Sequence, residues 1–129
     1  MQHTLLGLLN HLDKSPVECD GMSSLVATVL SKNNIDYKGM CGQIIPKGAG
    51  TPIPHVWIEV GEWVIDFRAR MWLGTDSSIP HGVFKKKDHK DLYTGSAVMI
   101  APLHDTLFQI LQMPFPGQIK QGNDEDPEP

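Results

Sequence analysis

The chain has little cysteine, few aromatic residues and no long apolar run, and each shortage argues against a class of protein. Only two cysteines, Cys19 and Cys41, occur in 129 residues, which excludes a disulfide-rich secreted scaffold. No apolar run approaches the roughly 18 residues of a membrane-spanning helix. The start, MQHTLLGLLN, lacks the cationic leader of a signal peptide. We therefore expect a cytoplasmic protein with free thiols and no membrane partner.

Positive charge is also scarce. Lysine and arginine number 11 against 15 aspartate and glutamate residues, so the net charge is −4, which argues against a nucleic-acid partner. The one basic cluster, FKKKDHK (84–90), is interrupted by Asp88 and is predicted to be a solvated loop. The 40% hydrophobic content is enough for one ordinary core, so neither disulfides nor a structural metal is needed for stability.

The patterning predicts one α+β domain over residues 1–113. An acidic, Pro-rich and Gly-rich tail (114–129) should be disordered and could carry a protein partner. A short helix capped by Thr4 is expected over 4–13. Further on we expect a strand at 35–45, a hairpin at 55–67, a strand at 96–102 and a helix at 103–113.

The second helix has the clearest start signals. In SPVECDGMSSLVATVL (15–30), Ser15 and Glu18 have the spacing of a capping box and Pro16 stands at the first helical position. Cys19 then lies one turn inside the helix, on the face of Met22 and Val26. The partial positive charge of a helix start favours the thiolate form of such a cysteine.

Two alternating runs around Gly61-Glu62, in HVWIEVGEWVIDF, predict a β-hairpin. A two-residue turn separates the side chains into a polar-containing face and an unbroken apolar face. On that register His55 and Asp66 are diagonal neighbours, so the carboxylate can orient the imidazole. The polar-containing face holds His55, Trp57, Glu59, Val64, Asp66 and Arg68, and the apolar face holds Val56, Ile58, Val60, Trp63, Ile65 and Phe67.

These residues carry a resemblance. A cysteine at a helix start, followed by HVWIEV and EWVIDF, resembles the transglutaminase-like (papain-like) superfamily of cysteine peptidases, over roughly residues 15–70. The resemblance implies a Cys-bearing helix packed on an antiparallel sheet, with Cys19 as nucleophile, His55 as general base and acid, and Asp66 orienting His55. It also implies acyl transfer through a thioester. One departure is that no clear glutamine stands shortly before Cys19, so the Cys19 N–H and another group would have to stabilise an oxyanion.

Other interpretations compete at each position. Cys41 is a rival nucleophile, but its strand has no helix terminus to favour a thiolate. A zinc site from Cys19, Cys41, His55 and His81 or His89 lacks paired short spacings, so we expect no metal. Trp57 is predicted to pack beside the site. Glu59 and Arg68 flank the same face and could pair with each other or meet the substrate, and we favour the structural role.

The leading hypothesis is a cysteine peptidase or amidase that needs no cofactor and acts on a peptide, amide or ester substrate. Loops 46–54 and 74–90 would shape its cleft, because both adjoin the hairpin. The alternative is a non-catalytic binding or adaptor module on the same fold, favoured by the small size and the missing oxyanion donor.

Overall fold

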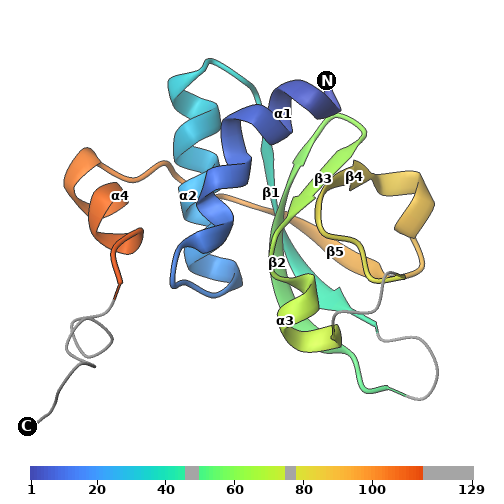
Figure 1. Cartoon of the computed structure of the whole chain (residues 1–129). Helices are drawn as coiled ribbons and strands as arrows, with labels where there is room; N and C mark the ends of the chain where they lie inside the picture. Colours follow the sequence, from blue (N-terminus) through green and yellow to red (C-terminus); the bar gives the residue numbers. More distant parts are fainter. Residues whose placement is uncertain (46–49, 75–77, 115–129) are drawn as a thin grey trace, which may run out of the picture.

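The structure is a computed structural model that describes residues 1–45, 50–74 and 78–114. It is an α+β fold in which a five-stranded antiparallel sheet, ordered β4-β3-β2-β1-β5, carries two N-terminal helices on one side (Figure 1). None of the helices in this described part of the chain has the length and hydropathy to cross a bilayer. The predicted C-terminal tail lies almost wholly in residues 115–129, outside the described residues.

The predicted elements appear in the predicted order with shifted bounds, and the additional elements are Ala69–Leu73, Gly82–Lys85 and Lys86–His89. The first helix begins at Gln2 with Met1 as its N-cap residue, so the cap predicted at Thr4 is wrong. The helices are α1 (Gln2–Leu9), α2 (Cys19–Lys32), α3 (Ala69–Leu73) and α4 (Asp105–Leu111), with 3-10 helices η1 (Asn10–Lys14) and η2 (Lys86–His89). The strands are β1 (Lys38–Ile44), β2 (Ile53–Val60), β3 (Trp63–Asp66), β4 (Gly82–Lys85) and β5 (Tyr93–Val98). The solvated loop predicted at 84–90 is wrong at its start, because Phe84 and Lys85 belong to β4 and pair with β3.

The hairpin has the predicted register. Ile58 pairs with Ile65, Glu59 with Val64 and Val60 with Trp63. Gly61 adopts a positive φ of 56°, which a two-residue turn between antiparallel strands requires. The two faces of the sheet therefore separate as the alternation indicates.

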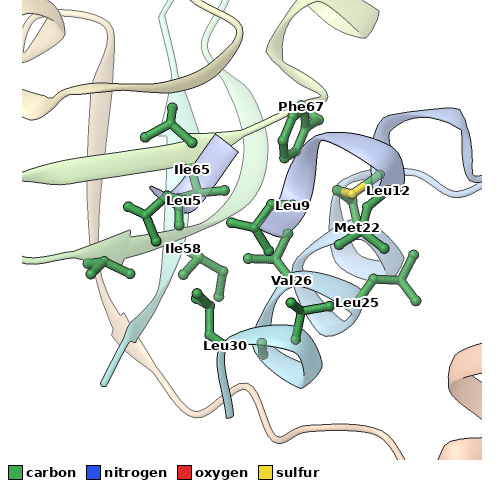
Figure 2. Packing of buried hydrophobic residues seen from close by; sticks show 14 residues of the cluster. Leu5, Leu9, Leu12, Met22, Leu25, Val26, Leu30, Ile58, Ile65 and Phe67 are labelled. Atoms are coloured by element: carbon green, nitrogen blue, oxygen red, sulfur yellow. The ribbon is translucent and has the colours of Figure 1, made fainter. Parts of the chain in front are cut away.

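The apolar face packs on α1 and α2 to form the main core. Ile58, Ile65 and Phe67 meet leucines of α1 and the buried side of α2 (Figure 2). Burying each such side chain contributes about 1.5–3 kcal/mol to stability. This cluster holds the helices on one side of the sheet, and its helical members include Leu5, Leu9, Met22, Val26 and Leu30.

The opposite face has a smaller aromatic core. Met40, Trp57, Val64 and Phe84 are buried there, with Tyr93 packed against them. The sheet order places β5 three strands from β3, roughly 14 Å away if the sheet were flat. Since the Tyr93 ring lies 4.9 Å from Trp57 and 6.0 Å from Phe84 on β4, the sheet curls around this core.

Two paired glycines allow strands β1 and β5 to approach closely within this curl. Gly42 faces Gly95 directly. A Cβ on Gly42 would lie 2.0 Å from the Thr94 carbonyl oxygen, and one on Gly95 would lie 2.9 Å from Trp57. Gly39 and Gly42 of β1 both lie where a side chain would collide with β5 or the segment after it.

Candidate functional site

His55 and Asp66 form a buried pair on the aromatic face. Nε2 of His55 lies 2.8 Å from Oδ2 of Asp66, the contact that the hairpin register predicts. The residues are only 2% and 4% exposed. The other carboxylate oxygen, Oδ1, accepts a hydrogen bond of 2.8 Å from the Arg68 backbone N–H. The carboxylate is thus held at both oxygens, and it fixes the orientation of the imidazole.

Tyr93 is a third member of this group, and sequence reasoning missed it. Its hydroxyl donates a 2.6 Å hydrogen bond to Asp66 Oδ2, the same oxygen that His55 engages. Burial, followed by the charge of Asp66, raises the pKa of Tyr93 well above its usual range, so the phenol remains a neutral donor. No local signal could have identified this residue, because the contact depends on the curl of the sheet.

Cys19 is a further neighbour of His55. The half-buried thiol acts on His55 through a hydrogen bond and its charge, which raise the pKa of the ring. Nδ1 of His55 is buried and makes no hydrogen bond of regular geometry to the described residues. The two groups that act on the ring are thus the Asp66 carboxylate, 2.8 Å from Nε2, and the Cys19 thiol.

The predicted start of the second helix is wrong. Ser15 ends η1, Pro16 and Val17 lie outside any helix, and Glu18 is the N-cap residue without a capping hydrogen bond from its side chain. The first hydrogen bond of α2 runs from the Met22 N–H to the Glu18 carbonyl. Cys19 is consequently the first helical residue, and its N–H is one of the amides that have no acceptor within the helix.

Arg68 explains this late start. All five of its side-chain N–H groups donate to oxygens, and the residue is only 7% exposed. Nε donates to the Val17 carbonyl and Nη2 to the Ser15 carbonyl, at 2.7 and 2.8 Å. A helix beginning at Pro16 would need those two carbonyls for its first turn. Arg68 therefore holds the chain extended up to Glu18.

The same contacts place Cys19 beside His55. The body of α2 packs on the apolar face of the sheet, opposite to His55. Arg68 follows directly after β3 and binds Val17, two residues before Cys19. The first turn of α2 is thereby fixed at the end of the sheet where Asp66 lies. The helix end, and not its side, reaches His55.

The protonated form of His55 is stabilised by its surroundings. Burial opposes the charged ring, but the hydrogen bonds and charges of Asp66 and Cys19 outweigh it and raise the pKa of His55 to about 9. At neutral pH the ring is therefore cationic, beside two groups that can carry negative charge. An imidazolium beside a thiol favours the thiolate and is already able to donate a proton.

The raised pKa of His55 leads to a prediction about how stability depends on pH. The folded pKa of about 9 exceeds the ordinary value of 6.5, so the stabilisation is complete below pH 6.5 and is lost as the pH rises through 9. Between about pH 6 and pH 10, the free energy of unfolding of the wild type should fall by about 3 kcal/mol more than that of His55→Gln. Urea denaturation at several pH values measures this difference. Parallel stability curves for the two proteins would contradict the raised pKa.

The remaining predicted site residues have structural partners. Trp57 is buried and donates through Nε1 to Glu59 at 3.1 Å, and Glu59 also pairs with Lys86 at 3.1 Å. Glu59 and Arg68 do not pair with each other; Nη1 of Arg68 pairs with Asp13 at 2.8 Å.

Cys41, the rival nucleophile, is an exposed free thiol on β1, opposite Val56. His81 bonds Asp13, and the His89 ring packs on Phe84. Within the described ranges no three histidine, cysteine or acidic residues are grouped as metal ligands would be.

The two loops predicted to shape a cleft are only partly visible, because residues 46–49 and 75–77 lie outside the described residues. What the described residues bring together is Cys19, His55 and Asp66, supported by Arg68 and Tyr93. In comparisons with known proteins, no family model, curated protein or solved structure matches the chain.

Proposed function

We propose that the protein is a transglutaminase-like cysteine peptidase or amidase, a hydrolase or acyltransferase that works through a thioester on Cys19. The single observation that carries the proposal is the buried contact of His55 with Asp66, in a ring whose pKa the neighbouring Cys19 thiol also raises. A buried imidazole beside both a thiol and an orienting acid is the arrangement that thiol catalysis requires. The substrate class is an amide or ester carbonyl, in a peptide or a smaller molecule.

The chemistry follows from the protonation states. The Cys19 thiolate attacks the carbonyl carbon, and the electron pair of the C=O bond moves to oxygen. The N–H of Cys19, at the start of α2, is placed to donate to that oxyanion. His55 gives its proton to the leaving amine or alcohol as the C–N or C–O bond breaks. Neutral His55 then takes a proton from the water or amine that attacks the thioester, which restores the thiolate and imidazolium.

Selective alkylation of Cys19 tests the reactive thiol without a known substrate. An unactivated thiol is almost fully protonated at about pH 6, whereas a thiolate paired with an imidazolium is not. We expect iodoacetamide at pH 6 to modify Cys19 at least about tenfold faster than Cys41, as located by peptide mass spectrometry. Cys19→Ala should abolish the fast phase, and Cys41→Ala should leave it intact.

Cys41 is the internal control, because it is the more exposed thiol and should be the faster one if accessibility alone decided the rate. Equal, slow labelling of both thiols would overturn the proposal. Catalysis is tested next with p-nitrophenyl esters and aminoacyl anilides. An acyl group trapped on Cys19 and released with turnover supports a hydrolase. Fast alkylation with no acylation by any of them would favour the non-catalytic binding module.

A further inference from the structure

Asp66 Oδ2 receives two hydrogen bonds, and this sharing has a consequence for His55. The oxygen lies 2.8 Å from His55 Nε2 and 2.6 Å from the Tyr93 hydroxyl. Both donors interact with the same negatively charged oxygen. A carboxylate that already accepts a short bond from a neutral phenol has less charge density to offer an imidazolium.

We propose that Tyr93 is a positioning residue that limits how strongly Asp66 holds the proton of His55. Tyr93 acts on His55 through Asp66 and not on the reacting atoms themselves, so it is not a catalytic residue. This inference rests on the proposed function for its purpose, since an acid that must release its proton in each cycle cannot be held too tightly. Its physical content, the effect of one hydroxyl on one imidazole, does not depend on catalysis.

The geometry supports a directed role for the Tyr93 hydroxyl. The ring is anchored edge-on to Trp57 and packs against Phe84, so the aromatic contacts do not depend on the hydroxyl. The Arg68 N–H holds Oδ1 of the same carboxylate, which prevents the carboxylate from turning away from Tyr93. The hydroxyl is thus aimed at an acceptor fixed by β3, from the far edge of the curled sheet.

The other charged groups near His55 and Asp66 either act on His55 in the same direction as Asp66 or have partners of their own. From α2, Cys19 acts on His55, and its effect raises the pKa in the same direction as that of Asp66. On the same face of β2, the Glu59 carboxylate is engaged by Trp57 and Lys86. From the segment before α2, Asp13 pairs with Arg68 and His81. Among the described partners of Asp66, Tyr93 is the side-chain donor that competes with His55.

Tyr93→Phe tests the inference, because it keeps the ring and removes only the hydroxyl. The pKa of His55 should rise by about half a pH unit or more, as measured by NMR titration of the imidazole resonances. His55→Gln identifies those resonances among the six histidines. Tyr37→Phe is the matched control, because Tyr37 also donates a hydrogen bond, a partly buried one to the Ile100 carbonyl, away from the site. It should leave the titration of His55 unchanged.

Fluorotyrosine provides the opposite change in an intact fold. In the Tyr37→Phe background, 3-fluorotyrosine labels Tyr93 alone, since the chain has two tyrosines. Its more acidic phenol is a stronger donor and should lower the pKa of His55. An unchanged pKa in both Tyr93 forms, or shifts of the opposite sign, would overturn the inference. If Cys19 proved unreactive while the two shifts appeared, the proposed function would fail and the role of Tyr93 would stand.

Discussion

Replacing Arg68 with methionine is expected to lower the free energy of unfolding by about 3–5 kcal/mol, the range for removing one partner from a buried ion pair. Methionine keeps much of the apolar volume but none of the five donors. The carbonyls of Asp13, Ser15, Val17 and Phe67 would then lose their hydrogen bonds from this side chain. A typical domain is stable by only about 5–15 kcal/mol, so the loss is a large share of the total. Urea denaturation measures it directly.

The matched control is Arg70→Met, two residues further along. Arg70 is half-buried and donates one described hydrogen bond, to the Ile79 carbonyl at 2.8 Å. We expect that variant to lose about 1 kcal/mol. If Arg68→Met cost no more than Arg70→Met, the interpretation of Arg68 as the residue that holds the start of α2 would be wrong. Where the Arg68 variant still folds, its Cys19 should also lose its fast alkylation, because the thiol would no longer be fixed beside His55.

Replacing Asp66 with asparagine is expected to lower the pKa of His55 well below its wild-type value of about 9. Burial favours the neutral ring, and Asp66 supplies both the strongest opposing hydrogen bond and a charge. At pH 7 a larger fraction of the rings would then be neutral. The fast alkylation of Cys19 at about pH 6 should fall by at least about tenfold, the effect of losing one pKa unit or more of stabilisation.

The charge of His55 can be followed with two alkylating agents. Iodoacetate is an anion and is attracted by an imidazolium, whereas iodoacetamide is neutral. The ratio of their rates at Cys19 should be high in the wild type until the pH approaches 9 and lower in Asp66→Asn. Asp105→Asn is the control, because Asp105 is an exposed carboxylate paired with Lys32 on the far side of α2. A ratio that is equal in the wild type and Asp66→Asn would show that Cys19 has no cationic neighbour.

The hairpin and its His55–Asp66 contact could be predicted from the sequence because they depend on local rules. Strict alternation sets the two faces, and a turn of two residues sets which side chains are opposite. Eleven positions separate the two residues, and nothing distant is needed to bring them together. The nucleophile could be proposed for a related reason, since it stands near a helix start under either interpretation of the helix boundary.

The helix boundary itself could not be predicted. Ser15, Pro16 and Glu18 satisfy every local rule for a capping box, yet Arg68 takes the carbonyls that such a helix would use. Fifty-one residues separate Arg68 from Val17. A tertiary contact thus overrides a strong local signal, and it leaves Cys19 as the first residue of α2 instead of one turn inside.

Strand β5 and the contact of Tyr93 also could not be predicted, because both depend on residues that are distant in the sequence. The late strand was predicted at 96–102, but pairing with β1 starts it at Tyr93, opposite Ile44. Residues 93–95 have no clear alternation of their own, so only the partner strand defines them as a strand. The contact from Tyr93 to Asp66 also requires the observed strand order and the curl of the sheet. Neither can be predicted from the periodicity of apolar residues in the sequence.

The position of β5 also sets the order in which the site can be completed during folding. β5 is the last strand among the described residues, and it joins the sheet at an edge beside β1, so its pairing closes a long loop of chain. Closing long loops is entropically costly, and such contacts tend to form late. The hairpin can form early and bring His55 to Asp66, but the carboxylate receives its hydrogen bond from Tyr93 only when β5 docks. A nascent chain that lacks β5 would therefore hold an unfinished site.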